Sequence, residues 1–355
     1  MTKNIIAVVL LISLITACVK NETEKKSSDE IIINDSLKMT QDYVVPVKTG
    51  LVTVVTRGAD TLCITDRPNQ TIQIPKTDAG IVATKSDDDD DDDDKIEVNY
   101  IPSSEINGYQ KNLFKCEQDY LLFFEDTKEG DYDYNDLVLY ARLYHYDDYY
   151  TGAKTYLFIK PIAYGATKKI AFGIEGDKNS AMLITDDVQK DLFLGKAPFT
   201  NTKGSFTEVI PTDYQSSFYG EATTLYNGKV KATIHKDKRY NEGGWFEILI
   251  SNYGYEYCVD GYANFYILVD GNKFYVASAS TAAGAYPYGI AIPNGRYWLK
   301  ETVSVDKGYN KFNSWVSNGT PKSWYNKAGY LNKSNFFEPD SHADYLKWNY
   351  YHTNN

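Results

Sequence analysis

Apolar and polar residues alternate in short runs along most of the chain, and this period of two is typical of β-strands with one face in a core. After residue 94 the pattern predicts twelve strands, which are Lys95–Ile101, Tyr120–Glu125, Leu137–Tyr146, Thr155–Ile162, Lys169–Ile174, Met182–Thr185, Phe206–Ile210, Val230–His235, Trp245–Ile250, Asn264–Val269, Lys273–Ala277 and Tyr288–Ile292. Many short strands without intervening helices predict a mainly β fold, and specifically an antiparallel, jelly-roll-like β-sandwich over residues 96–338.

Two dipeptides between predicted strands indicate hairpins. Asn227-Gly228 and Asp270-Gly271 supply the positive φ values that a tight turn of type I′ requires. The strands on either side of each dipeptide are therefore expected to pair.

The same alternation occurs earlier, over residues 42–80. Its runs are Leu51–Val55, Thr61–Thr65 and Thr71–Ile74. About 35 residues make only a marginal core, so this small β-module either folds by itself or packs on the later strands. Residues 81–95 then form a predicted linker, because the consecutive aspartates Asp87 to Asp94 repel one another and extend the chain. Loose calcium binding by this run is the alternative.

A helical period appears only near the end of the chain. Tyr309, Phe312, Trp315 and Val316 share one face of a predicted helix from residue 306 to 318, which Gly319 ends. Thr320-Pro321 predicts the start of a further helical turn. We expect the aromatic side chains to close one end of the sandwich, and we expect residues 339–355 to be a fraying tail.

The N-terminus carries an export signal. In residues 1–17 the apolar run is about half the roughly 20 residues that a membrane-spanning helix needs, which indicates a signal peptide. The segment Ile15-Thr16-Ala17-Cys18 resembles a bacterial lipobox, so Cys18 is the predicted lipid anchor, with an incidental cysteine as the alternative. Residues 18–41 are a predicted flexible tether. Val19 differs from the aspartate that retains many lipoproteins in the inner membrane, so we expect the outer membrane and, as a hypothesis, the cell surface.

Charge and cysteine content narrow the class of partner. A net charge of −11 disfavours nucleic acid and favours divalent cations and neutral partners. Besides Cys18 the chain has Cys63, Cys116 and Cys258. An exported protein permits one disulfide among them, but the odd count and the spacing do not predict a disulfide scaffold. The chain has no HExxH, GxSxG or phosphate-binding glycine motif, so we predict that it is not an enzyme.

A second group of oxygen ligands lies at the connection between two predicted strands. It consists of Glu125, Asp126, Asp131, Asp133, Asn135 and Asp136. Alternating carboxylate and amide side chains in a tight loop are typical of Ca²⁺ ligands, so we predict a structural calcium site here. The loop is not an EF-hand, because its sixth position is Asp136 and its twelfth is Arg142. The alternative is a solvated acidic turn.

Tyrosine is used heavily, with 32 residues in the chain. Tyr253, Tyr255 and Tyr257 alternate and so share one side of a strand, where they could stack on sugar rings. The alternative is that they only pack, since strands are enriched in tyrosine. Carbohydrate binding, or a carbohydrate-active protein, is therefore one alternative function, and a structural envelope component is another.

Two separated blocks resemble a known family. The first is Phe124-Glu125-Asp126 with Gly130-Asp131-Tyr132-Asp133-Tyr134-Asn135-Asp136-Leu137-Val138, and the second is Tyr286-Pro287-Tyr288-Gly289-Ile290-Ala291-Ile292-Pro293 with Tyr309-Asn310-Lys311-Phe312-Asn313-Ser314-Trp315-Val316. They resemble LruC-domain proteins, which are surface lipoproteins of Bacteroidetes and spirochaetes with no assigned function. The resemblance covers residues 100–330 and implies no catalytic residues. Together with the acidic loop, it predicts a lipid-anchored, non-catalytic binding or adhesion module whose partner is a glycan or a surface protein.

Overall fold

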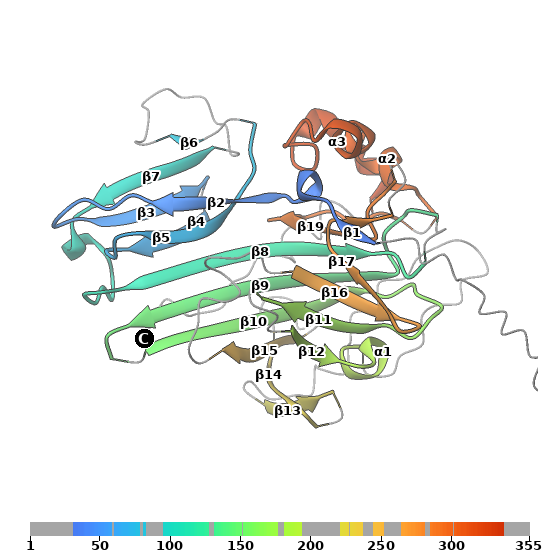
Figure 1. Ribbon diagram of the computed structural model, residues 1–355, viewed down its shortest axis with the longest axis horizontal. Helices are drawn as coiled ribbons and strands as arrows, with labels where there is room; N and C mark the ends of the chain where they lie inside the picture. Colours follow the sequence, from blue (N-terminus) through green and yellow to red (C-terminus); the bar gives the residue numbers. More distant parts are fainter. Residues whose placement is uncertain are drawn as a thin grey trace, which may run out of the picture. The chain divides into compact units, whose positions relative to one another are not determined.

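The computed structural model is mainly β (Figure 1). It describes residues 31–58, 60–78, 81–82, 95–127, 131–150, 152–176, 181–193, 221–226, 228–236, 244–251, 264–280, 285–300 and 302–336. Its helices are short: η1 (Asp35–Leu37), η2 (Ser103–Glu105), α1 (Val188–Asp191), α2 (Val305–Gly308), α3 (Phe312–Asn318), η5 (Ala328–Tyr330) and η6 (Lys333–Asn335). The predicted mainly β fold is therefore confirmed.

One eleven-stranded sheet organises the chain. Its strands are β3 (Val52–Arg57), β4 (Asp60–Thr65), β6 (Ile81–Val82), β7 (Ile96–Ile101), β8 (Phe114–Phe124), β9 (Leu137–Asp148), β10 (Gly152–Ala163), β13 (Glu221–Leu225), β14 (Val230–Lys236), β15 (Gly244–Ser251) and β19 (Gly289–Pro293). They follow the order β13-β14-β15-β10-β9-β8-β4-β3-β7-β6, and β19 also pairs with β8. The long strands β8, β9 and β10 form an antiparallel meander at its centre (Figure 1).

A second sheet completes the sandwich. It contains β11 (Ala171–Glu175), β12 (Ala181–Thr185), β16 (Asn264–Val269) and β17 (Asn272–Tyr275) in the order β12-β11-β16-β17. Phe124 of the main sheet lies edge-on to Phe172 with 6.4 Å between ring centroids, and both belong to one buried cluster that we call the sandwich core. This core confirms the predicted sandwich. Sheets of eleven and four strands differ from the two equal sheets of a jelly roll.

The predicted hairpin at residues 270–271 is present. Val269 pairs with Asn272, which leaves a two-residue loop. Asp270 has φ 50° and Gly271 has φ 78°, the positive values of a type I′ turn.

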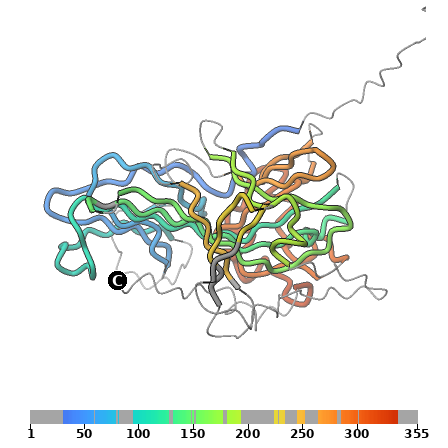
Figure 2. The backbone as a smooth tube through the Cα atoms, turned by 90° about the horizontal axis from the view of Figure 1, so that it is seen from below, coloured from blue at the N-terminus to red at the C-terminus, as the bar shows by residue number. Residues whose placement is uncertain are grey.

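The N-terminal strands continue the main sheet. β4 pairs with β8, and β3 lies between β4 and β7. β2 (Thr40–Val45) pairs with β5 (Gln70–Pro75) in a two-stranded sheet, whose Ile72 and Ile74 reach the sandwich core. Figure 2 shows the blue N-terminal strands beside the teal and green strands of the main sheet. Residues 42–80 were expected either to fold by themselves or to pack on the later strands. In the structure they pack on the later strands.

The opposite face of the main sheet is covered by an aromatic cluster from the C-terminal part of the chain. It includes the buried side chains of Tyr309, Phe312, Trp315, Trp324 and Phe336, which pack with Leu121 and Phe123 of β8. The rings of Trp315 and Trp324 are stacked, with 4.9 Å between their centroids. These aromatic residues are buried, but they cover a face of the main sheet and do not close one end of the sandwich as predicted.

The single predicted helix over residues 306–318 is divided. α2 ends at Gly308 and α3 begins at Phe312, because Tyr309 between them pairs with Leu331 and its ring is buried. Gly319 has φ 72° and caps α3 as predicted. The predicted helical turn does not begin at Thr320-Pro321, whose peptide bond is cis. Residues 322–326 form turns instead, and the N–H of Lys327 donates to the carbonyl of Ser323 at 3.2 Å around Trp324 and Tyr325.

The predicted tether is too long at its C-terminal end. β1 (Ile32–Ile33) pairs with β18 (Ser278–Ala279), and Leu37 and Met39 are buried in the aromatic cluster. The Nε1–H of Trp324 points to Met39 Sδ at 3.4 Å. Residues 32–41 are therefore part of the fold, because β1 pairs with β18 and the side chains of Leu37 and Met39 pack in the aromatic cluster. Residues 1–17, the aspartate run, the predicted strand Phe206–Ile210 and residues 339–355 lie outside the described residues.

Candidate metal centre

The predicted metal loop lies at the connection between β8 and β9. β8 ends at Phe124, and the backbone N–H of Glu125 donates to the carbonyl of Tyr288 at 3.0 Å, which continues the pairing with the neighbouring segment. Both acids that come after the strand are buried, with Glu125 2% and Asp126 4% exposed. Carboxylates this well removed from water require donors or a cation.

The loop is held in an unusual backbone conformation. Tyr132 and Tyr134 have φ 56° and 57°, a left-handed conformation that costs non-glycine residues about 1–3 kcal/mol each. Several contacts hold it: the N–H of Tyr134 donates to Glu125 Oε1 at 2.7 Å, and its hydroxyl donates to the carbonyl of Pro287 at 2.5 Å. The N–H of Val305 donates to the carbonyl of Tyr132 at 2.7 Å. These bonds fold the loop back over the end of β8.

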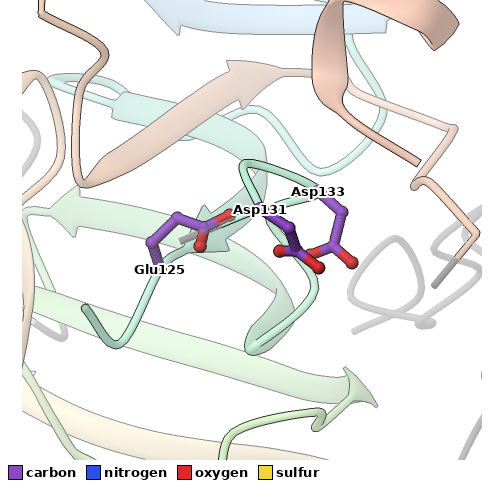
Figure 3. Close-up of side chains that lie close together, drawn as sticks. All are labelled: Glu125, Asp131 and Asp133. Carbon is purple, nitrogen blue, oxygen red and sulfur yellow. The ribbon is translucent and has the colours of Figure 1, made fainter. Parts of the chain in front are cut away.

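Three carboxylates converge inside this loop. Glu125, Asp131 and Asp133 each place one oxygen within 4.8 Å of an oxygen of the other two, and Figure 3 shows the three groups close together. Ca²⁺ binds oxygens at about 2.3–2.6 Å, so two ligands of one ion lie up to about 5 Å apart. Glu125 and Asp133 are buried and Asp131 is exposed, which gives the group an open side. The geometry is compatible with one cation at this point.

Burial and repulsion raise the pKa of carboxyl groups here. Burial, and after it the charge of Asp136, raises the pKa of Glu125 to about 9. Burial also raises the pKa of Asp136 to about 8, against the hydrogen bond from the Asp126 N–H, which lowers it. Without a cation, burial therefore shifts both groups toward the protonated form, and a bound cation would favour the ionised form.

The other three predicted ligands make hydrogen bonds that shape the loop. Asp136 Oδ2 accepts from the N–H of Asp126 at 2.6 Å, and Asp126 Oδ2 accepts from the N–H of Lys168 at 3.3 Å. Asn135 Nδ2 donates to Asp133 Oδ2 at 2.9 Å. Of the predicted set, the structure thus brings Glu125, Asp131 and Asp133 into one acidic group, whereas Asp126 and Asp136 lie outside it.

Asp133 also joins the loop to a distant segment. Its Oδ2 accepts from the backbone N–H of Thr302 at 2.8 Å. The loop backbone packs closely as well, because the N–H of Gly165 donates to the carbonyl of Asn135 at 3.1 Å and a Cβ on Gly165 would lie 3.0 Å from Asn135 Oδ1. The sequence pattern pointed to neither Thr302 nor Gly165, because each contact joins the loop to a residue far away in the chain.

The predicted tyrosine row at residues 253, 255 and 257 lies outside the described residues. Other tyrosines gather on the main sheet, on the face that carries the aromatic cluster. The ring of Tyr144 lies 6.4 Å from that of Tyr146 and 6.5 Å from that of Tyr156. Beside them is an open groove of about 660 Å³, lined by Tyr156, Thr224, Lys231, Ala232, Thr233, Glu247 and Leu249. The groove therefore combines the ring of Tyr156 with the hydroxyl, ammonium and carboxylate groups of its other side chains. Such a combination is compatible with binding a sugar.

Comparisons with known proteins give little further information. No family model matches the chain, and no curated protein matches it. The LruC resemblance therefore stays a prediction. A solved structure described as a "Putative lipoprotein from Bacteroides ovatus" is 11% identical, with a TM-score of 0.37, and the match covers 89% of this chain and 97% of the other. We draw no conclusion about fold or function from a likeness of this size.

The predicted anchor is outside the part of the chain that the structure describes. Cys18 precedes the first described residue, Ile31. Within the described residues, none of the helices has the length and apolar character needed to cross a bilayer.

Proposed function

We propose that the protein is a lipid-anchored envelope protein, held at the outer membrane through Cys18, whose β-sandwich is a non-catalytic binding or adhesion module with a structural Ca²⁺. The convergence of Glu125, Asp131 and Asp133 carries this proposal, since their oxygens lie within 4.8 Å of one another in a loop that joins two parts of the fold. The lipobox-like segment that ends at Cys18 supports the anchor.

The ion would act by neutralising charge in a buried loop. It would replace the proton that burial favours on Glu125, and its charge would favour the ionised form of Asp136 beside the group. Three carboxylates are fewer than the six to eight oxygens that Ca²⁺ takes, so backbone carbonyls or water would complete its shell from the exposed side at Asp131. Because Asp133 also accepts from Thr302, the ion would brace the β8–β9 connection against the segment that precedes the aromatic cluster.

The experiment that tests this proposal is a calorimetric Ca²⁺ titration of the full chain in detergent. We expect one ion bound per chain, and we expect Asp131→Asn to weaken binding at least tenfold, since a charged ligand is lost. Glu105→Gln is the matched control, because Glu105 is an exposed acid in η2. No binding by the unaltered protein at millimolar Ca²⁺ would contradict the calcium part of the proposal.

Anchoring has a separate test. Cys18→Ser should move the protein from the membrane fraction to the soluble fraction and abolish labelling with a palmitate analogue. Protease treatment of intact cells then reports surface exposure: digestion supports it, and protection contradicts it. These measurements do not depend on calcium.

The groove beside Tyr156 favours a second candidate function, glycan binding. Its lining places the Tyr156 ring with Lys231, Thr233 and Glu247, and carbohydrate sites in general combine an aromatic face with such hydrogen-bonding groups. A glycan array of the unaltered protein tests it first, and binding by Tyr156→Ala is then compared with binding by the unaltered protein. Tyr149→Ala is the control, because Tyr149 is 77% exposed. Loss of binding only in the first variant supports this function, and an array without any binding counts against it.

A further inference from the structure

Two cysteines face each other across neighbouring strands. Cys63 lies in β4 and Cys116 in β8, and the antiparallel register places them directly opposite. Residues that are directly opposite in an antiparallel pair project to the same face of the sheet. Both side chains are buried in the sandwich core at 1% exposure, which agrees with that placement. The two side chains therefore lie side by side on the core face, where the amide Nε2 of Gln118 donates to Cys116 Sγ at 4.0 Å.

The hydrogen-bond pattern defines the type of pair. One step beyond the last pair of the ladder, Thr65 with Phe114, the N–H of Asp66 donates to the carbonyl of Leu113 at 3.4 Å, which is one of the two bonds of a hydrogen-bonded position. Bonded and non-bonded pairs alternate along an antiparallel ladder, and Cys63 with Cys116 is three steps away. They form a non-bonded pair, for which the Cα atoms lie about 4.5 Å apart. This separation is within the range of about 4.4–6.8 Å that a disulfide spans.

We propose that Cys63 and Cys116 form a disulfide bond in the exported protein. The structure has both as free thiols. In the reaction the two thiols lose two protons and two electrons as the S–S bond forms. The acceptor is the disulfide of a thiol–disulfide exchange partner, whose own S–S bond breaks to give two thiols. Compartments beyond the inner membrane supply such acceptors, so this step rests on the proposed export of the chain and not on the calcium site.

Burial determines when the bond can form. The pKa of Cys116 is raised to about 12 by burial, and the pKa of Cys63 is raised by burial and by its proximity to Cys116. Exchange requires a thiolate, so the thiols react slowly once the sheet has closed over them. The bond therefore forms before β4 and β8 are buried.

The bond would join the N-terminal strands covalently to the main sheet. It closes the loop from residue 63 to residue 116, which includes β5, β6, β7 and the aspartates Asp87 to Asp94. A cross-link over a long loop lowers the entropy of the unfolded chain and so favours folding. The bond would keep β3 and β4 attached to β8, although the mutually repelling aspartates Asp87 to Asp94 lie between β4 and β8 in the sequence.

Peptide mapping of the full chain, isolated from membranes, tests the proposal. Free thiols are blocked with N-ethylmaleimide in mildly acidic denaturant, where this reagent still alkylates thiols while thiol–disulfide exchange is slow, and the protein is then digested without reduction. We expect a linked pair of peptides that contain Cys63 and Cys116, and we expect Cys258 to be alkylated. Alkylation of both Cys63 and Cys116, or a link from either to Cys258, overturns the proposal.

Equilibrium unfolding in urea gives a second readout. A reductant should lower the urea midpoint of the unaltered protein by about 1 M, because reduced unfolded chains gain entropy. The reductant should have no effect on the double variant Cys63→Ala/Cys116→Ala, and it should still act on Cys258→Ala. A midpoint of the unaltered protein that does not respond to the reductant overturns the proposal. Export failure would appear instead as loss of the protein from the membrane fraction, and failure of the calcium site leaves both readouts unchanged.

Discussion

Thr302 donates its backbone N–H to Asp133 Oδ2 at 2.8 Å, although 169 positions separate the two residues in the chain. Slightly further along the same segment, the N–H of Val305 donates to the carbonyl of Tyr132. The acidic loop and the segment that leads into the aromatic cluster are therefore joined side by side. We therefore expect a change in the charge of the loop to affect the packing of the aromatic cluster on the main sheet.

The two aspartates of the metal group should respond differently to substitution. Asp131→Asn should reduce the stabilisation by Ca²⁺ and leave the free energy of unfolding in EGTA unchanged, because Asp131 is exposed. Asp133→Ala should lower that free energy by about 1–3 kcal/mol even in EGTA, since Asn135 and Thr302 lose their acceptor. Urea unfolding monitored by tryptophan fluorescence measures both. Equal behaviour of the two variants would contradict these different roles.

Calcium should change how stability depends on pH. The pKa of Glu125 is about 9 in the folded chain, against the ordinary 4.5, so the folded state binds more protons than the unfolded state between these values. In EGTA this group's contribution to stability is therefore present below about pH 4.5 and is lost as the pH rises toward 9. The raised pKa of Asp136, about 8, acts in the same direction.

Bound Ca²⁺ should reduce this loss, because it favours the ionised groups and releases their protons. Unfolding at pH 5.5, 7 and 8.5, with Ca²⁺ and with EGTA, measures the effect. Glu125→Gln should make the profile in EGTA flatter. If the gain from Ca²⁺ were the same at all three pH values, protons and calcium would not compete for these groups.

Close packing behind the loop should make Gly165 sensitive to a methyl group. In Gly165→Ala the new Cβ would lie 3.0 Å from Asn135 Oδ1 and 3.1 Å from its carbonyl oxygen. The loop must shift, so we expect a loss of about 1–3 kcal/mol in stability and weaker Ca²⁺ binding. Gly329→Ala is the matched control, since its Cβ would meet nothing within 4 Å. Urea unfolding and calorimetry of both variants check this prediction, and equal results would contradict it.

The docked N-terminal segment should contribute to stability. Met39 is buried against Trp324, so Met39→Ala should cost about 2–5 kcal/mol in the free energy of unfolding. Ile33→Ala, at a 39% exposed position in β1, should cost much less. A negligible effect of Met39→Ala in urea unfolding would mean that residues 31–41 behave as the predicted tether after all.

The sequence predicted most strands because their pattern is local. Leu137, Leu139 and Leu143 face the sandwich core while Val138, Tyr140 and Tyr144 face the aromatic cluster, as a period of two requires. The helix break at Tyr309 depends on its pairing with Leu331, which no local pattern contains. The docking of Leu37 and Met39 likewise depends on Trp324, far along the chain.

The acidic loop was predictable as a group but not in its geometry. Residue types alone do not distinguish Asp131 and Asp133, which converge on Glu125, from Asp136, which turns to the N–H of Asp126. The left-handed backbone at Tyr132 and Tyr134 decides which side chains converge, and tyrosine carries no signal for that conformation.

The melting temperature of the full chain, measured by calorimetry in Ca²⁺ and in EGTA, tests the calcium-braced module most directly. At about 100 times the dissociation constant, the ion should raise the melting temperature by about 4 °C. In Asp131→Asn the difference between the two conditions should fall to about half or less, because a site at least ten times weaker is at no more than about 10 times its dissociation constant. An unaltered protein whose melting temperature is the same in millimolar Ca²⁺ and in EGTA would contradict a calcium ion bound by Glu125, Asp131 and Asp133.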